Sequence, residues 1–123
     1  MNVVDSSGWL EYFANGRNAD FFAPAILDTD ELVVPAISIY EVFNRILRDR
    51  SERDALSVIA IMSRGLVIPL DMEVSLNAAE LSIELKLPMA DSIILATARA
   101  HNAVLWTQDS DFRGLEGVEY IEA

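Results

Sequence analysis

The sequence predicts an α/β fold with a central parallel sheet of four to five short strands and helices on both faces. Short apolar runs alternate along the chain with longer segments whose apolar side chains recur at helical spacing, and this alternation is typical of parallel βαβ units. A length of 123 residues, 52% of them hydrophobic, is sufficient for one domain to bury a core. Because we find no internal repeat, low-complexity tract or linker, we expect residues 1–123 to form a single domain.

The expected strands are short and apolar. The first ends at an acid, Asp5, and the second is ended by Pro35, which cannot donate a hydrogen bond to a neighbouring strand. The predicted strands are residues 2–5, 32–34, 66–70, 103–107 and 118–121.

The expected helices follow from apolar side chains spaced three and four residues apart. Ser6 or Ser7 could cap the first helix. Ser38 could cap the third, where Glu41 stands at the capping-box spacing. The last helix is apolar almost all round, so it should lie at the centre of the fold. The predicted helices span about residues 8–14, 18–28, 39–49, 53–63, 72–85 and 88–100.

The charge of the chain restricts its partners. Twenty acidic residues stand against nine basic ones, for a net charge of −11, and such a surface as a whole repels nucleic acid and anionic membranes. The absence of cysteine and the presence of one histidine, His101, exclude thiolate and multi-histidine metal sites within one chain. Any metal bound here should therefore be a hard cation such as Mg²⁺, Mn²⁺ or Ca²⁺.

The chain also shows no sign of export or membrane insertion. Its start, MNVVDSSGW, has no basic region followed by an apolar stretch, and no apolar run approaches the roughly 18 residues of a membrane span. Together with the lack of cysteine, this favours a cytoplasmic protein without a membrane partner.

Several acids are expected to meet at one edge of the sheet. Asp5 and Asp109 follow predicted strands, and sites in open α/β sheets form outside the carboxyl ends of the strands. Asp91 heads the apolar stripe of the last helix, where an acid that serves only the helix dipole would be out of place. We favour a functional role for Asp5 as well, because the serines that follow it could cap the helix without burying a charge.

The other acids have good structural explanations when they are taken singly. Glu41 could complete a capping box or pair with Arg45 one turn later, and Asp109 and Asp111 could form a polar loop with an Asx-turn. Carboxylates gathered at one edge would, however, repel one another unless a cation lay between them or some were protonated. A hard divalent metal is the simplest explanation of the whole set.

Other chemistries are less well supported. His101 ends a helix away from the acids, which argues against a Ser-His-Asp site, and no glycine-rich phosphate-binding motif is present. A local basic cluster is more simply a solvated helix face than a phosphate-contact patch. Its members are Arg45, Arg48, Arg50 and Arg53.

Four segments in this order, "VVDSSGWLEYF", "SIYEV", "LPMADSIILATARAH" and "LWTQDSDF", closely resemble the VapC-type toxins of the PIN-domain ribonuclease family. The resemblance extends over essentially the whole chain, although residues 50–85 match only in helix pattern. It implies a single PIN-like nuclease domain: a Mg²⁺- or Mn²⁺-dependent endoribonuclease, the toxin of a type II toxin–antitoxin pair, forming a homodimer with a cognate antitoxin and acting on RNA.

The same resemblance assigns roles to individual residues. Asp5, Glu41, Asp91 and Asp109 match the metal-binding, catalytic acids of the family. Thr107 and Ser7 match hydroxyl positions around the site, and Asp111 matches a position where a further acid is frequent but variable.

Two other classes of protein remain alternatives. A phosphoacceptor receiver domain has a similar length and strand-end acids, but it resembles this chain poorly, because Asp5 stands alone and the only lysine, Lys86, belongs to a helix end. A catalytically silent acidic binding module is the other alternative, and it would show no response to divalent metal.

Overall fold

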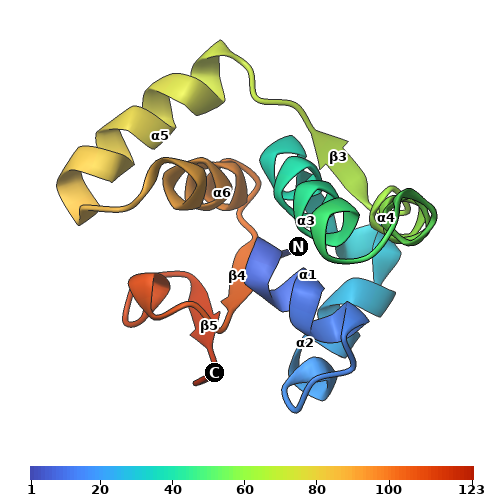
Figure 1. The fold of residues 1–123 in the computed structure, drawn as a ribbon. Helices are drawn as coiled ribbons and strands as arrows, with labels where there is room; N and C mark the ends of the chain where they lie inside the picture. Colours follow the sequence, from blue (N-terminus) through green and yellow to red (C-terminus); the bar gives the residue numbers. More distant parts are fainter.

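Five short strands, all paired in parallel, form the centre of the protein (Figure 1). The computed structural model describes residues 1–123. Strands β1 (Asn2–Val4), β4 (Val104–Thr107) and β5 (Val118–Tyr120) form one sheet in the order β1-β4-β5, and β2 (Val33–Pro35) pairs with β3 (Leu66–Ile68). A single parallel bridge between Asn2 and Leu32 joins the two groups of strands. The strand order across the array is therefore β3-β2-β1-β4-β5, which confirms the predicted α/β architecture.

Six α-helices and two short 3₁₀ helices connect these strands. None of the α-helices combines the length and apolar character needed to cross a bilayer. They are α1 (Ser6–Phe13), α2 (Ala19–Leu27), α3 (Ala36–Asp49), α4 (Glu52–Met62), α5 (Met72–Leu85) and α6 (Met89–Ala100), with η1 (Thr29–Glu31) and η2 (Ser110–Phe112) between them.

The alternation of side chains along the strands produces two cores, one on each face. Val4 and Val34 pack with α1, α2, α3 and α4, whereas their neighbours Val3 and Val33 pack with α6 and with Phe112 of η2. Successive residues of a strand point to opposite faces, so two adjacent valines supply both cores. Helices thus cover both faces, as predicted.

Helix α6 is the most buried helix of the protein. Every residue from 92 to 98 is buried, and α5 packs along its outer side (Figure 1). This arrangement explains the nearly uniform apolar character of the segment, since α6 lies between the strands and another helix.

The beginning of α3 differs from the prediction. The helix starts at Ala36 rather than near residue 39, and its N-cap, Pro35, offers no side-chain hydrogen bond. Ser38 is therefore not a cap; it lies buried in the first turn, and its hydroxyl has no hydrogen-bond partner. Ile37 packs against the core that contains Val3, Val33 and α6. This tertiary contact outweighs the local preference of serine for a capping position.

The predicted strand 66–70 is also shorter than expected, because β3 ends at Ile68. Pro69 follows directly, and a proline has no N–H with which to continue a ladder of hydrogen bonds. The sequence signal for this strand came from apolar character alone, which extends to Leu70 although the pairing does not.

Gly8 allows α1 to pack closely on α2 and β1. A Cβ at this position would lie 2.6 Å from Phe22 Cε1 and 2.7 Å from Val4 Cγ1, and both side chains are fully buried. We expect Gly8→Ala to lower the melting temperature by roughly 5–10 °C, because overpacking of about 1–3 kcal/mol exceeds the gain in helix propensity.

Circular dichroism melting of the purified variant checks this prediction. Asn77→Ala, at an exposed position within α5, is the matched control and should leave the melting temperature unchanged or slightly raised. An unchanged melting temperature for Gly8→Ala would show that α1 and α2 can separate without cost.

Candidate functional site

The acids singled out from the sequence come from four elements that meet at the carboxyl ends of β1 and β4. Asp5 directly follows β1, and Asp109 follows β4 by one residue. Asp91 lies in the first turn of α6, and Glu41 lies in α3. The carboxyl ends of parallel strands are the usual place for sites in open α/β folds, and the topology explains why residues so distant in sequence converge here.

Asp5 is buried, with only 2% of its surface exposed, and its carboxylate is held by three donors. Oδ1 accepts hydrogen bonds from the Gly8 N–H (2.9 Å) and the Ser7 hydroxyl (2.8 Å), and Oδ2 accepts one from the Thr107 hydroxyl (2.7 Å). Asp5 is therefore the N-cap of α1, and the expectation that Ser6 or Ser7 caps this helix is wrong. The position of the acid at the strand end lets it serve the helix and face the site at once.

The surroundings of Asp5 act on its pKa in opposite directions. Burial raises the pKa of Asp5, the hydrogen bonds from Thr107, Gly8 and Ser7 lower it, and the negative charge of Asp109 raises it slightly. The net result is a pKa of about 6. Desolvation dominates because a buried carboxylate loses the water that would stabilise its charge.

Thr107 connects two of the acids through a single hydroxyl. Its side chain is fully buried; the hydroxyl donates to Asp5 and accepts a hydrogen bond from the backbone N–H of Asp109 at 2.9 Å. Thr107, the last residue of β4, thus positions both Asp5 at the end of the paired strand β1 and the loop that carries Asp109.

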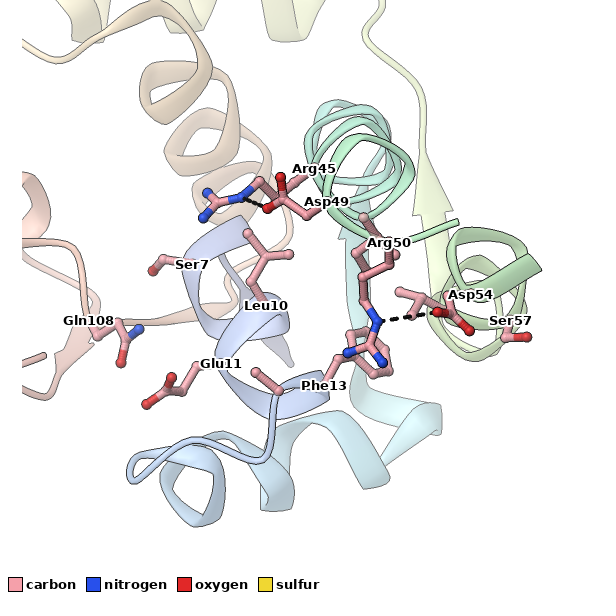
Figure 2. A pocket seen from close by; sticks show the side chains of 13 residues that line it. Ser7, Leu10, Glu11, Phe13, Arg45, Asp49, Arg50, Asp54, Ser57 and Gln108 are labelled. Atoms are coloured by element: carbon pink, nitrogen blue, oxygen red, sulfur yellow. Dashed lines mark hydrogen bonds and ion pairs between the residues drawn. The ribbon is translucent and has the colours of Figure 1, made fainter. Parts of the chain in front are cut away.

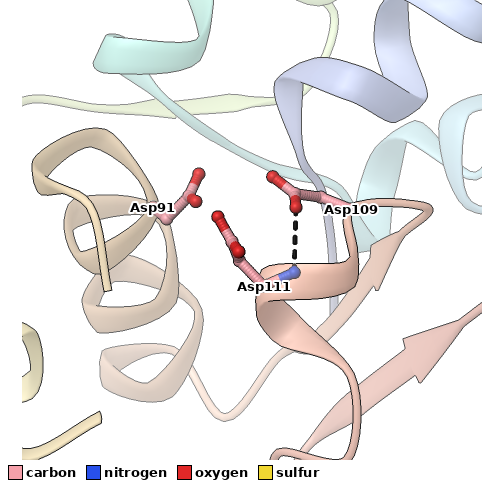
Figure 3. Close-up of side chains that lie close together, drawn as sticks. All are labelled: Asp91, Asp109 and Asp111. Atoms are coloured by element: carbon pink, nitrogen blue, oxygen red, sulfur yellow. Dashed lines mark hydrogen bonds between the residues drawn. The ribbon is translucent and has the colours of Figure 1, made fainter. Parts of the chain in front are cut away.

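Three carboxylates come close enough to share one cation. Oxygen atoms of Asp91, Asp109 and Asp111 lie within 4.8 Å of one another, and Figure 3 shows their carboxylates converging between α6 and η2. The N–H of Asp111 donates to Asp109 Oδ1 at 2.9 Å, which makes the Asx-turn expected for this loop. The turn and the cluster are therefore compatible, and the structure places Asp111 within the group.

Asp91 has the most strongly perturbed carboxyl group of the protein. Burial, and after it the charges of Asp109, Asp5, Asp111 and Glu41, together raise its pKa to about 7. No ion pair of the protein involves any of these acids. An all-oxygen group with uncompensated negative charge fits a hard divalent cation such as Mg²⁺ or Mn²⁺.

Glu41 joins the site through α1. Its Oε1 accepts a hydrogen bond of 2.7 Å from the Ser6 hydroxyl, a contact between residues 35 positions apart that no local sequence pattern indicates. Neither structural explanation offered for Glu41 holds, since the helix has no capping box and Arg45 pairs with Asp49 instead. Asp5 and Glu41 both lie outside the group of mutually close oxygens, although their charges act on Asp91.

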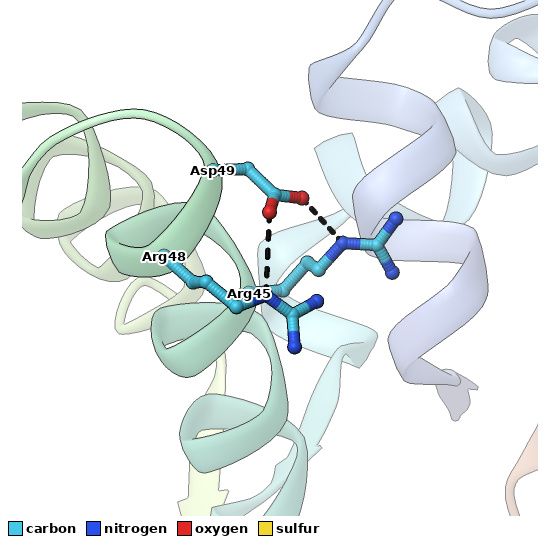
Figure 4. A network of polar contacts seen from close by, with 3 residues as sticks. All are labelled: Arg45, Arg48 and Asp49. Atoms are coloured by element: carbon cyan, nitrogen blue, oxygen red, sulfur yellow. Dashed lines mark hydrogen bonds and ion pairs between the residues drawn. The ribbon is translucent and has the colours of Figure 1, made fainter.

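Three of the four arginines of the basic cluster form ion pairs with nearby acids. Arg45 and Arg48 both donate to Asp49, as Figure 4 shows, and Arg50 donates to Asp54. The hydrogen bonds from the two arginines of α3 lower the pKa of Asp49. This arrangement favours the interpretation of the cluster as a solvated helix face.

A groove of about 630 Å³ extends from the acidic edge along α1 toward α4. Figure 2 shows Ser7 and Gln108 at one end of it and the ion pair of Arg50 and Asp54 at the other. Apolar side chains, among them Leu10, form part of its wall. At its end next to the acidic edge, the groove is lined by Ser7, which donates to Asp5, and by Gln108, which precedes Asp109 in the chain.

The fold and the acidic edge together define the class of this protein. The family model for the PIN domain matches residues 3–118, and the chain belongs to the PIN domain family. Within that family, the fold is similar to those of chains from toxin–antitoxin complexes, VapBC complexes among them. A comparison with curated proteins gives no match.

Solved structures of other proteins have a similar fold. The protein is similar to a chain of a toxin–antitoxin complex from Klebsiella pneumoniae, with a TM-score of 0.84, 26% identity and 100% of both chains covered. It is similar in fold to DNA-bound VapBC from Salmonella typhimurium, with a TM-score of 0.74, 16% identity and coverage of 99% of this chain and 98% of that one. VapC20 of Mycobacterium tuberculosis, described as a Sarcin-Ricin loop cleaving toxin, has a TM-score of 0.73 and 17% identity over 91% of this chain and 92% of its own.

Proposed function

We propose that residues 1–123 form a single PIN-like nuclease domain that acts as the toxin of a type II toxin–antitoxin pair and hydrolyses RNA phosphodiester bonds with the help of Mg²⁺ or Mn²⁺. One observation carries the proposal: three carboxylates of a PIN domain lie within 4.8 Å of one another and are neutralised by no basic residue of the chain. Such a group is stable in its ionised form when a cation lies between its members.

The proposed roles follow from the positions of the acids. Asp91 and Asp109 would hold the cation, with Asp111 as a further ligand and Asp5 as a ligand either directly or through water. Glu41, held by Ser6, would orient a water molecule or a ligand from the other side. When bound, a divalent cation supplies a water of lowered pKa and stabilises negative charge on the phosphate.

The hydroxyl groups around Asp5 orient this acid and favour its ionised form against the effect of burial. Ser7 and Thr107 donate to the same carboxylate, and donors to the charged form favour that form. Together with the Gly8 N–H they fix both oxygens of Asp5 before any ligand arrives. The protein therefore does not need to reorganise this acid when it binds metal.

The partners are proposed from the relatives and from the charge. The similar chain from Klebsiella pneumoniae comes from a toxin–antitoxin complex, and we propose a cognate antitoxin and a homodimer for this protein. A net charge of −11 suits a basic protein partner. RNA, the proposed substrate, would be met locally, through the cation and single donors rather than through a broad basic face, and the cytoplasm is where toxin and substrate would meet.

Expression in a bacterial host, followed by sequencing of RNA ends, tests the proposal. We expect the wild-type protein to arrest growth and to produce discrete RNA ends, and we expect Asp5→Asn to do neither. Asp20→Asn, an exposed acid in the first turn of α2, is the matched control and should behave as wild type. Equal toxicity of wild type and Asp5→Asn would overturn the nuclease assignment.

A further inference from the structure

Asn18 is a buried amide that connects three distant parts of the chain next to the acidic edge. Only 7% of its surface is exposed. Its Nδ2 donates to Gln108 Oε1 at 2.9 Å and to the backbone carbonyl of Glu122 at 3.1 Å, and its backbone N–H donates to Glu11 Oε2 at 3.0 Å. The residue thus ties the connection between α1 and α2 to the loop after β4 and to the segment after β5.

These contacts determine the orientation of the Gln108 amide. A backbone carbonyl can only accept, so the group of Asn18 that faces Glu122 must be its Nδ2 rather than its oxygen. Both hydrogens of this Nδ2 are then used, one toward each acceptor. Gln108 must therefore present its oxygen to Asn18, and its Nε2 is left as a donor without a partner in the chain.

The free donor lies where the groove meets the carboxylates. Gln108 stands between Thr107, which holds Asp5, and Asp109. Its side chain lines the groove together with Ser7, as Figure 2 shows. The carboxylates of this edge repel phosphate, so a neutral amide with two N–H groups beside them is a suitable local contact for an anionic substrate.

We propose that Gln108 binds the RNA substrate through its Nε2, by donating a hydrogen bond to a phosphate oxygen next to the cleaved bond, and that Asn18 is the positioning residue that keeps this donor turned outward. The inference rests on the proposed function and adds a substrate contact to it. Removing the donor should weaken RNA binding without disturbing the carboxylates, because the hydrogen bonds of Asp5 and Asp109 do not involve the Gln108 side chain.

Single-turnover cleavage of a fluorescein-labelled 40-nucleotide random-sequence RNA pool, with enzyme in excess and Mn²⁺ present, tests this. We expect Gln108→Met to raise the enzyme concentration for half-maximal rate by about tenfold, with little change in the maximal rate. Its thermal stabilisation by Mn²⁺ should equal that of wild type. Asn77→Met, an exposed amide on α5 far from this edge, is the matched control and should not change either quantity.

Asn18→Asp provides the second variant. An aspartate at position 18 can no longer donate, so the Gln108 amide turns its Nε2 inward, and we expect the half-saturating concentration to rise as in Gln108→Met. The double variant should be no worse than either single one, since both remove the same contact. Melting curves show whether Asn18→Asp still folds. If it does not, the cleavage kinetics of Gln108→Met alone test the proposal.

The outcomes separate the inference from the proposed function. Cleavage by the wild type with unchanged kinetics in Gln108→Met overturns the inference alone. A fall in the maximal rate, or a loss of the Mn²⁺ stabilisation in Gln108→Met, also overturns it, because the side chain would then act on the carboxylates. Absence of metal-dependent cleavage by the wild type overturns the proposed function, and the inference with it.

Discussion

In EDTA at pH 8, Asp91→Asn is expected to melt roughly 5 °C above the wild-type protein, although it should lose RNA cleavage and stabilisation by Mn²⁺. Burial and the nearby acids raise the pKa of Asp91 to about 7, which means that its ionised form is unfavourable in the folded protein. Removing that charge stabilises the metal-free protein by about 2 kcal/mol when allowance is made for partial exposure to water. Differential scanning fluorimetry with and without Mn²⁺ measures both effects.

The advantage of Asp91→Asn should depend on pH. An unfolded aspartate titrates near 3.8, whereas folded Asp91 titrates near 7, so the folded wild type binds more protons than the unfolded chain between these values. The stability contributed by this group is fully present below pH 3.8 and is lost as the pH rises through 7. Asparagine does not titrate, and the difference in melting temperature should therefore shrink as the pH falls from 8 toward 4.

Asp20→Asn is again the control for this experiment, because Asp20 also stands in the first turn of a helix but is exposed. It should lose only the small favourable interaction of an acid with the helix N-terminus. A melting temperature of Asp91→Asn below that of the wild type in EDTA at pH 8 would mean that the carboxylate is stabilised in the apo protein, contrary to its surroundings.

The two acids of the loop after β4, Asp109 and Asp111, are expected to contribute unequally to Mn²⁺ binding and to RNA cleavage. Asp109→Asn is expected to lower Mn²⁺ affinity and the cleavage rate by more than about 100-fold, because substitutions of groups that merely orient metal ligands already cost 10–100-fold. Asp111→Asn should cost about tenfold, since this side chain is exposed and its backbone N–H still supports Asp109. Isothermal titration with Mn²⁺ and cleavage of the random-sequence RNA pool measure the two quantities.

Glu116→Gln, an exposed acid in the same region of the chain, controls for the change in net charge and should leave both quantities unchanged. Equal losses for Asp109→Asn and Asp111→Asn would show that the two acids are equivalent ligands. A larger loss for Asp111→Asn would contradict the proposed order of importance.

The convergence of the acids could be predicted from the sequence because it depends on rules that act over long distances without detailed packing. Asp5 and Asp109 follow apolar strands, and parallel strands bring their carboxyl ends to one edge. Helix α6 was recognisable from its almost continuous apolar character, and helical spacing then placed Asp91 in line with its buried residues. Strand ends and helical spacing can be recognised in a sequence without knowing the contacts between individual side chains.

The details that escaped prediction depend on tertiary contacts. Ser38 is a good cap by propensity, yet packing of Ile37 extends the helix past it. Asp5 takes the capping role because it is the single residue between the end of β1 and the start of α1. The apolar pattern of the sequence does not show where α1 begins. The bond between Asn18 and Gln108 joins residues 90 positions apart, and two amides among polar loop residues carry no sequence signal of their pairing.

The position of β4 in the middle of its sheet has a consequence for how the protein folds during its synthesis. Strand β4 lies between β1 and β5, and Thr107 holds Asp5 across a separation of 102 residues. A chain leaves the ribosome from its N-terminus and begins to fold in that order. Asp5 therefore lacks the hydrogen bond from Thr107 until most of the domain has been made. The three close carboxylates, Asp91, Asp109 and Asp111, also come late in the chain, so the proposed metal site is completed only when the C-terminal part of the domain has been made.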